Sequence, residues 1–532
     1  MFTIPFLLIA AAIGILWKVY AYVGFRSIPK GLKPLPGPKG YPFLGSLLEF
    51  PKTFSYHKFK EWSDQYGPIY QVNILGKTHV VISSEDIAND LLALRGAHYS
   101  DRPPIVMLHE LISANGNLGT TPLNKYWRNS RKLSAAALSS TSLKKWNAMQ
   151  IDEAARLVLD LLSTPDQYEY LFERYSSVVT LRLLYNKEVP MAEEKGHVKR
   201  IAAIVRTLER SVAPGAYLVD FLPILKYLPE CLAPFKAEAK VLHDFEHSYF
   251  KSLVAESEEA YNKIDSLDKR LRGLVHIFLD NKQSWDLNDF EIAYCMGTLL
   301  QGGSGTTSSA MQSYCLAMWH YPEWQLRVQR ELDEVVGEDR LPSFDDWPNL
   351  PTVRAVMKET LRWRPVVPGG IPHYSTKDDN YKGYFIPKGS IFHANQFAMF
   401  KNEKVYLDAE GFNPERWLNP KYPTFQTPLT QYPNLKRFAS FGFGRRICPG
   451  LESAERSLSI EISMLMWACN VEKKLDINGN VIPVPWYDTK PGNNTGPNPF
   501  HFNLTLRSGK KLELLRTFLE QGVRQQGGAG DF

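Results

Sequence analysis

The stretch from Phe290 to Pro322 reads FEIAYCMGTLLQGGSGTTSSAMQSYCLAMWHYP and contains no proline before its last residue. Asp286 or Asn288, just before it, is suited to cap the start of a helix. About 30 residues of α-helix extend roughly 45 Å, which is enough to cross a large domain. We therefore expect one long helix through the whole domain, with the other elements arranged around it.

The middle of this predicted helix contains Gly302, Gly303 and Gly305, followed by Thr306 and Thr307. Each glycine costs a helix about 1 kcal/mol relative to alanine. One explanation is that glycine lets a flat group approach the backbone, while a threonine hydroxyl bonds a freed carbonyl or a small ligand. The other is tight helix packing through small residues, and the residues alone leave both open. A phosphate loop is disfavoured because no lysine follows the glycines.

The segment FASFGFGRRICPG, residues 438–450, surrounds a lone cysteine, Cys448. The chain has an odd number of cysteines, and no two of them have the spacing of a zinc or redox pair. A dinucleotide loop is excluded because Ile447 stands where its third glycine would fall. A nucleophilic cysteine needs a base, and none is nearby in the sequence. The remaining chemistry is a single thiolate on a metal that brings its other ligands, which suits haem iron.

The residues around Cys448 are suited to such a site. Gly444 and Gly450 let the backbone turn sharply. Phe441 can shield a flat apolar face, and Arg446 can pair with a carboxylate. Backbone amides in such a turn can bond a thiolate and set its basicity.

A second helical pattern, VRAVMKETLRWRP at 353–365, places Glu359 and Arg362 three residues apart and so on one side of a helix. If that side is buried, the pair must be satisfied, and Arg416 in FNPERWL can complete it. A solvated surface pair is the alternative.

The N-terminal residues 2–25 are apolar except for Thr3 and Lys18, and they are long enough to span a hydrocarbon core of about 30 Å. They predict a transmembrane anchor over 1–25. A cleaved signal peptide is disfavoured because the segment has no basic start and no small-residue cleavage site. Basic residues follow the segment, so the positive-inside rule places the catalytic body in the cytosol. A proline-rich stalk is predicted over 26–45, because proline stiffens the chain.

The rest of the chain predicts one domain that is mainly α with small β-sheets. Helical patterns dominate from about 126 to 364, whereas 69–75 and 78–83 read as a hairpin and strand signals return at 378–396. The net charge, 62 − 56 = +6, is small for 532 residues and no basic run is interleaved with aromatics, so nothing marks a nucleic-acid binder. We assign residues 46–508 to the domain and 509–532 to a C-terminal tail.

The loop FGFGRRICPG resembles the haem-binding loop of the cytochrome P450 family, and the resemblance covers nearly the whole chain. The residues at the family's spacing are Phe441, Gly444, Arg446, Cys448 and Gly450. The resemblance implies a cytochrome P450 fold behind the anchor. It also implies haem b, iron protoporphyrin IX, with an axial thiolate from Cys448.

The resemblance also assigns roles outside the loop. It makes Glu359, Arg362 and Arg416 a structural triad. GGSGTT resembles the oxygen-binding segment, and the catalytic residues it implies are Gly303, Thr306 and Thr307. Haem propionates are expected to contact Trp127, Arg131 and His373. Ordinary core and surface roles for these three remain the alternative.

One departure from the family pattern concerns Gly305, which stands where the family usually has an acid. Proton delivery is then expected to rely on Ser304, Thr306, Thr307 and water. The same departure is also consistent with peroxide leakage, with a polar group supplied by the substrate, or with a reaction other than simple hydroxylation.

The resemblance implies a monooxygenase on the endoplasmic reticulum membrane, with a single pass and its body facing the cytosol. It would insert one atom of O2 into a small apolar metabolite such as a terpenoid, polyketide or alkaloid, as in fungal secondary metabolism. Segments 101–121 and 205–228 are expected to line the pocket. Electrons would come from NADPH–cytochrome P450 reductase.

An acidic partner of this kind would dock on basic residues near Cys448, unless these form only a solvated charge cluster: Lys132, Lys436, Arg437 and Arg445. Two other functions remain open. One is a haem-thiolate enzyme that couples, cyclises or rearranges its substrate, and the other is a non-catalytic haem sensor.

Overall fold

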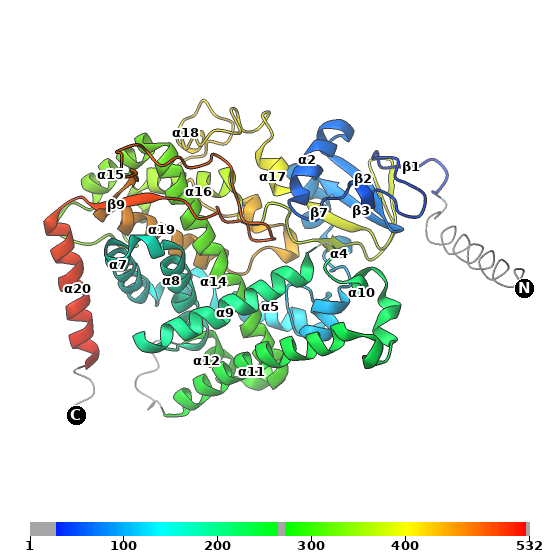
Figure 1. The fold of residues 1–532 in the computed structure, drawn as a ribbon, viewed down its shortest axis with the longest axis horizontal. Coiled ribbons are helices and arrows are strands. Elements are labelled where there is room, and N and C mark those ends of the chain that lie inside the picture. The colour runs from blue at the N-terminus through cyan, green and yellow to red at the C-terminus, as the bar shows by residue number, and fades with distance from the viewer. Residues whose placement is uncertain (1–27, 214, 264–271, 528–532) are drawn as a thin grey trace, which may run out of the picture.

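Helices make up most of the structure, a computed structural model that describes residues 28–213, 215–263 and 272–527 (Figure 1). The predicted anchor over 1–25 lies outside the described residues. Within the described part, no helix has both the length and the hydropathy needed to cross a bilayer. A single cluster of buried side chains reaches from Leu35 to Leu515. The prediction of a mainly α fold with small sheets is confirmed.

The helices, in chain order, are α2 (Ser55–Tyr66), α3 (Glu85–Ala88), α4 (Gly96–Tyr99), α5 (Lys125–Ala137), α6 (Ser140–Lys144), α7 (Asn147–Ser163), α8 (Tyr168–Tyr185), α9 (Met191–Val212), α10 (Leu218–Phe221), α11 (Pro234–Lys263), α12 (Leu274–Leu279), α13 (Lys282–Trp285), α14 (Asp289–His320), α15 (Pro322–Val335), α16 (Pro351–Trp363), α17 (Gln396–Phe400), α18 (Glu415–Leu418), α19 (Leu451–Ala468) and α20 (Gly509–Gly527). The strands are β1 (Lys33–Pro34), β2 (Ile69–Ile74), β3 (Lys77–Ile82), β4 (His373–Tyr374), β5 (Asp379–Tyr381), β6 (Tyr384–Ile386), β7 (Ile391–Ala394), β8 (Cys469–Lys473) and β9 (Phe502–Leu506).

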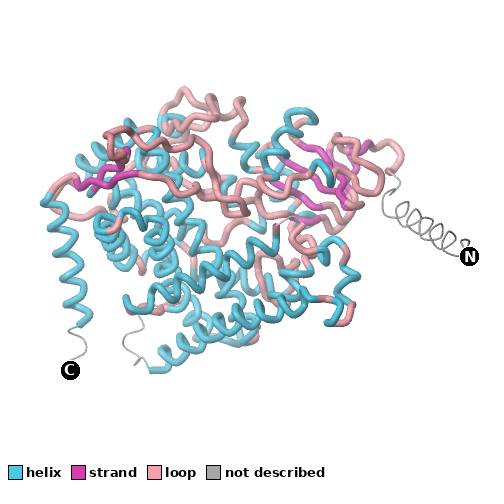
Figure 2. Tube along the Cα trace, viewed as in Figure 1, coloured by secondary structure: helices cyan, strands magenta, loops and turns pink. Residues whose placement is uncertain are grey.

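The strands gather in two places, with β8 and β9 far from the rest (Figure 2). The larger sheet has the order β2-β3-β7-β4, and a smaller one the order β1-β6-β5. The predicted hairpin is confirmed as the antiparallel pair β2 and β3. Its turn is Leu75-Gly76, one residue earlier than the sequence suggests. Both residues have positive φ, which matches the twist that a two-residue hairpin requires.

The predicted long helix is α14, which crosses the body of the molecule (Figure 1). Asn288 caps it: its side chain accepts a hydrogen bond from the Glu291 amide at 2.9 Å, and the Glu291 carboxylate accepts one from the Asn288 amide at 3.0 Å. Such a reciprocal cap satisfies two of the free donors at the helix start. The helix ends just before Pro322, which begins α15.

Glu359, Arg362 and Arg416 meet in the core, fully buried between α16 and α18. Arg362 donates to both carboxylate oxygens of Glu359, at 2.8 and 2.9 Å, and Arg416 donates at 3.0 Å. Trp417 Nε1 and the Asn413 amide donate to the same carboxylate at 3.0 and 2.8 Å. Since the carboxylate receives five hydrogen bonds in the core, the alternative of a solvated surface pair is wrong.

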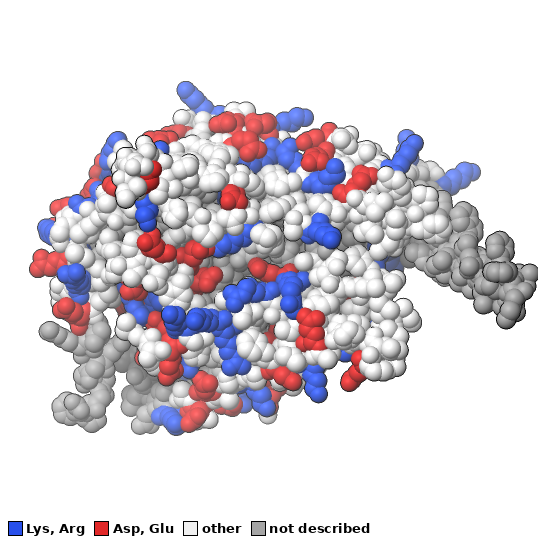
Figure 3. Space-filling view, viewed as in Figure 1, with Lys and Arg blue, Asp and Glu red and all other residues white. Residues whose placement is uncertain are grey.

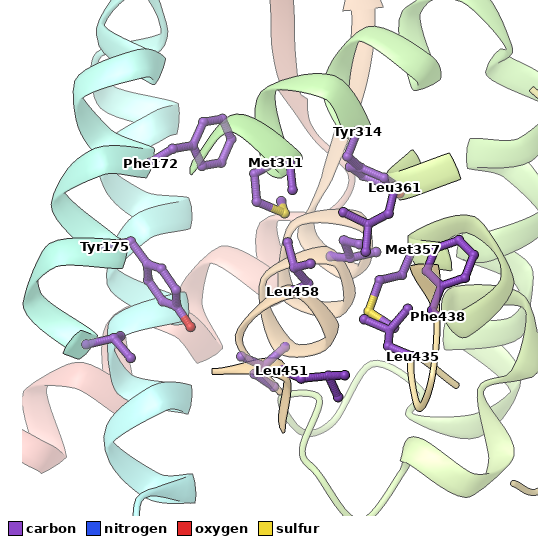
Figure 4. Packing of buried hydrophobic residues seen from close by; sticks show 14 of the residues in the cluster. Phe172, Tyr175, Met311, Tyr314, Met357, Leu361, Leu435, Phe438, Leu451 and Leu458 are labelled. Carbon is purple, nitrogen blue, oxygen red and sulfur yellow. The ribbon is translucent and has the colours of Figure 1, made fainter. Parts of the chain in front are cut away.

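Around α19, buried side chains from α8, α14 and α16 pack against one another (Figure 4). Glu461 of α19 lies in this region and is 1% exposed. Neither of its carboxylate oxygens has a hydrogen-bond partner among the described residues. Burial raises the pKa of Glu461 well above its ordinary value of 4.5, so the folded protein keeps this carboxyl protonated.

Glu461→Gln is therefore expected to make the protein more resistant to urea at pH 8 than the wild type. Above about pH 4.5 the unfolded chain releases this proton while the folded chain retains it, so wild-type stability falls as the pH rises. Each pH unit spent in that window removes about 1.4 kcal/mol. Urea midpoints between pH 5 and pH 8 measure the difference. The exposed Glu513→Gln serves as control, and equal pH dependence in Glu461→Gln and wild type would contradict the assignment.

Candidate active site

The Cys448 loop is held in one shape by its glycines and by a backbone hydrogen bond. The Cys448 amide donates to the Phe441 carbonyl at 2.8 Å. Gly442 and Gly444 have φ of +79° and +58°, a region that favours glycine. A Cβ at Gly444 would lie 2.1 Å from the carbonyl oxygen of Leu92, so no larger residue fits there.

The Cys448 side chain is exposed, although burial among protein atoms raises the pKa of its thiol. The Gly450 amide and the charge of Arg131 act against this and lower the pKa. The two observations agree if the sulfur faces an open space inside the fold. The backbone at Gly302 of α14 is also uncovered, because a Cβ there would meet no atom within 4 Å.

Arg446 points inward from the loop and is held by backbone carbonyls. Its Nε donates to Ser100 and its Nη2 to Thr121, each at 2.7 Å. Its Nη1 is buried and has no partner among the described residues. Its guanidinium carbon lies 4.4 Å from the ring centroid of Trp127. The guanidinium carbon of Arg131 lies 5.9 Å from the same centroid.

Arg131 and His373 lie near the same guanidinium. Arg131 Nη2 donates to the carbonyl of Ile447, next to Cys448, at 2.9 Å. His373 Nδ1 is 2.8 Å from the carbonyl oxygen of Tyr99, so this nitrogen carries a hydrogen. The pKa of His373 is lowered to about 3. Burial is the main cause and the charge of Arg102 is the second, whereas the hydrogen bond to the Tyr99 carbonyl acts in the opposite direction.

Arg102 is a further cation of this cluster that the sequence analysis did not assign. It is buried, and its Nε donates to Gly119 at 2.8 Å while its Nη1 donates to Ile371 and Pro372. Burial and the charges of Arg446 and Arg131 hold the pKa of Arg102 well below its usual range, whereas Asp101 raises it. In the sequence, Arg102 could have been recognised as an arginine at the start of the segment 101–121, which is mostly apolar.

These residues fit the propionate end of a haem. The guanidiniums of Arg102, Arg131 and Arg446 and the imidazole of His373 lie together. Asp101 is the carboxylate that acts on Arg102 and Arg446, so the cluster is net positive. A buried cluster of like charge is unfavourable unless an anion neutralises it, and two propionates supply two negative charges. The unpartnered Nη1 of Arg446 is a free donor for one of them.

The glycines of α14 have different surroundings. A Cβ at Gly303 would lie 2.6 Å from Thr180 Oγ1 of α8, so Gly303 allows close packing of two helices. The backbone at Gly302, by contrast, has no protein atom against it. Gly302 thus fits the approach of a flat group, and Gly303 fits tight helix packing. Gly303, which was expected to be catalytic, faces the neighbouring helix α8. Thr306 Oγ1 donates to the Gly302 carbonyl at 2.8 Å, and Thr307 is buried.

Alanine at each of these two glycines is expected to have opposite effects on stability. In the haem-free protein, Gly302→Ala should fold and be slightly stabilised, by up to about 1 kcal/mol, because alanine favours helix and its methyl meets no protein atom. Gly303→Ala should be destabilised by about 1–3 kcal/mol, because its methyl overlaps Thr180. Thermal melting of the two proteins measures this. Equal melting points would contradict the assignment.

The four basic residues predicted to dock a partner, Lys132, Lys436, Arg437 and Arg445, are all exposed. Lys132 Nζ lies 5.5 Å from the ring of Trp285, and Arg445 belongs to the short helical turn η9 (Gly444–Arg446), just before Cys448. On the face shown in Figure 3, by contrast, basic side chains gather along α9.

The comparisons with known proteins agree with this geometry. The sequence profile of the cytochrome P450 family matches residues 35–480. A cytochrome P450 monooxygenase of Armillaria gallica is 35% identical over 92% of this chain and 93% of its own. Cytochrome P450 monooxygenase psoD of Aspergillus fumigatus is 37% identical over 84% of this chain and 85% of its own.

A zebra fish cytochrome P450 solved with abiraterone superposes with a TM-score of 0.66 and covers 85% of this chain and 100% of its own. At 23% identity this similarity concerns the fold, and it confirms the predicted one. The family implies a haem bound through a cysteine thiolate. The chain belongs to the cytochrome P450 family and is an oxidoreductase of its monooxygenase class.

Proposed function

We propose that this protein is a membrane-anchored haem-thiolate monooxygenase that inserts one atom of O2 into a small apolar metabolite, with electrons from NADPH through a reductase. The observation that carries the proposal is Cys448: an exposed thiol next to the residue that Arg131 binds, in a loop that excludes larger residues at Gly444. A haem bound there would supply the oxidising chemistry, because a thiolate ligand favours O–O cleavage.

The chain's own residues have distinct tasks in this proposal. Cys448 is the metal ligand, and the Gly450 amide stabilises its thiolate form. Trp127, Arg131, His373 and Arg446 hold the propionates, with Arg102 as an additional cation. Thr306 places a hydroxyl beside the open backbone at Gly302, where it can hold a proton. The triad of Glu359, Arg362 and Arg416 ties α16 to the chain around α18.

Membrane association is supported by the apolar segment 1–25 and by exposed apolar side chains after α9. Leu218, Ile224, Tyr227 and Leu232 are each between 63% and 74% exposed, an unusual amount of apolar surface for one short region. Figure 1 shows α10 and β1 at the same end of the molecule. We propose that this end rests on the endoplasmic reticulum membrane, with the anchor at 1–25. The predicted stalk at 26–45 joins the body at β1, and the predicted tail at 509–532 packs on it through Leu515, so the haem domain extends beyond 46–508 at both ends.

The substrate class follows from the segments proposed to line the pocket. The buried side chains of 101–121 include five apolar ones, Val106, Met107, Leu108, Ile112 and Leu118, and five polar ones, Arg102, His109, Ser113, Asn117 and Thr121. Pockets for small molecules are lined by apolar side chains together with a few polar groups that orient the ligand. A terpenoid, polyketide or alkaloid fits this description, as in the secondary metabolism of fungi. The reductase would dock on the basic side chains near Cys448.

The test is metabolite profiling of a host with and without the gene, grown under heavy-isotope dioxygen, with Cys448→Ala as control. A product that carries one labelled oxygen atom, absent in the control, establishes the monooxygenase and its substrate class. A new product without label supports oxidative coupling or rearrangement instead. Haem binding without substrate-stimulated NADPH consumption supports a sensor.

A further inference from the structure

Helix α14 carries no Asp, Glu, His, Lys or Arg between Glu291 and His320. Oxygen insertion nevertheless consumes protons: a substrate C–H bond, O2, two electrons and two protons give an alcohol and water. The Thr306 hydroxyl already donates to the Gly302 carbonyl. A positioned side chain can supply such protons, and an acid that does so here would come from another element of the fold.

The turn at 490–496 approaches α14 where the helix has no side chain. A Cβ at Gly305 would lie 3.1 Å from Asn494 Nδ2, so the amide of Asn494 lies against bare helix backbone. The turn is pinned on both sides of this contact. The Thr495 amide donates to Val366, and the Lys490 amide donates to Gly496, each at 2.8 Å.

The side-chain oxygen of Asn494 accepts no hydrogen bond from the described residues. This atom, Oδ1, is buried. Leaving a buried acceptor unsatisfied costs about 1–3 kcal/mol, and buried polar groups of this kind usually bind an ordered water. Asn494 thus has an acceptor ready for a water molecule next to Gly305.

An acid lies on the outer side of the same turn. Glu209 of α9 has its Oε2 3.8 Å from the position of a Cβ on Gly492, and the backbone amide of Asn494 hydrogen-bonds its carboxylate. Burial raises the pKa of Glu209, and the Asn494 amide partly offsets this.

The charges that act on Glu209 come from α8, from α9 itself and from the turn, whereas α14 contributes none. Arg206 of α9 and Lys490 of the turn lower its pKa, and Glu173 of α8 raises it. Lys490 is itself ion-paired with Glu169 of α8. Glu209 itself is partly exposed on α9, so the solvent can replace a proton that it gives up.

We propose that Asn494 is a positioning residue that holds a water beside Gly305, and that Glu209 is the acid that supplies this water with protons for Thr306. The proposal rests on the monooxygenase function proposed above. With protons delivered there, one oxygen atom enters the substrate and the other leaves as water. When delivery through this route fails, the two electrons and two protons taken up from solvent leave with O2 as hydrogen peroxide instead.

The test uses the full-length, haem-loaded protein with its reductase, and it measures product and peroxide per NADPH consumed. Asn494→Ala and Glu209→Gln are each expected to lower the ratio of product to peroxide by about a hundredfold, at the low end of effects for proton-transfer groups. The exposed neighbour Asn493→Ala is the matched control and should leave the ratio unchanged. Unaltered ratios in Asn494→Ala or Glu209→Gln would overturn the proposal.

The pH profile separates proton supply from a merely structural effect. Since Glu209 donates its proton, the wild-type ratio should fall as the pH rises through the pKa of this carboxyl. Glu209→Gln should remove that fall and leave a flat, low ratio with unchanged haem content. A fall that persists in Glu209→Gln would overturn the assignment of the acid.

A rescue variant tests whether a polar side chain at position 305 can replace the Asn494 amide. Gly305→Asp alone puts its Cβ 3.1 Å from Asn494 Nδ2 and is crowded, whereas Asn494→Ala opens that space. The double variant Gly305→Asp with Asn494→Ala is therefore expected to recover much of the lost ratio. A double variant no better than Asn494→Ala alone would overturn the proposal.

A crystal structure of the haem-loaded protein gives a readout that does not depend on turnover. We expect an ordered water within hydrogen-bond distance of Asn494 Oδ1, and its absence would overturn the role of Asn494. A wild type that forms no labelled product would instead overturn the monooxygenase function, and the water at Asn494 would still decide the positioning role.

Discussion

Cys448→Ser is expected to abolish both the thiolate spectrum and oxygenation. A serine hydroxyl does not ionise at neutral pH and is a poor iron ligand, so any haem that remains loses its thiolate. The carbon monoxide complex of the reduced protein should therefore lose the long-wavelength absorption band that a thiolate ligand produces. Product formation with NADPH and reductase should fall to background.

The matched control is Cys231→Ser, because Cys231 is also exposed but lies far from the loop in sequence. It should keep the wild-type spectrum and activity. A long-wavelength band that survives in Cys448→Ser, or is lost in Cys231→Ser, would show that Cys448 is not the ligand.

Glu359→Ala is expected to destabilise the protein by about 3–5 kcal/mol or to prevent its folding. The carboxylate receives hydrogen bonds from Arg362, Arg416, Trp417 and the Asn413 amide, all in the core. Its removal leaves two buried guanidiniums without a counter-charge, which is the costly way to break a buried ion pair. Thermal loss of the haem absorption band measures the effect where the variant folds, and the yield of soluble haem-loaded protein measures it where it does not.

Glu334→Ala is the matched control, since Glu334 is exposed on α15 and its loss should stay within about 0.5 kcal/mol. A melting point of Glu359→Ala close to that of the control would mean that the cluster contributes little to stability. The two arginines would then have to be satisfied by the carbonyls of the chain around α18 alone.

The elements predicted correctly from the sequence depend on neighbours along the chain. The start of α14 is set by Asn288 and Glu291, three residues apart, and its end by Pro322. The β2–β3 hairpin and the Cys448 loop are likewise encoded by alternating apolar residues and by glycines that adopt positive φ. Such features follow from backbone sterics and short-range hydrogen bonds, which a sequence shows directly.

Other assignments needed contacts between distant segments. Gly302 and Gly303 are adjacent and chemically identical, and only the approach of Thr180 shows which of them packs against α8. Arg102 carries no local signal beyond its apolar surroundings, and its role depends on meeting Arg446 and His373 from other parts of the chain.

The sequence by itself determined the family, the cysteine that serves as candidate ligand and the long helix, because each is a pattern of residues at fixed spacing. It also showed that Gly305 leaves the helix without an acid, but not what replaces one. Only the tertiary structure supplies the contacts from which a replacement is proposed, by placing Asn494 against Gly305 and Glu209 beside the same turn. The physical reason is that proton supply and charge neutralisation depend on distances across the fold, which the spacing of residues along a chain does not contain.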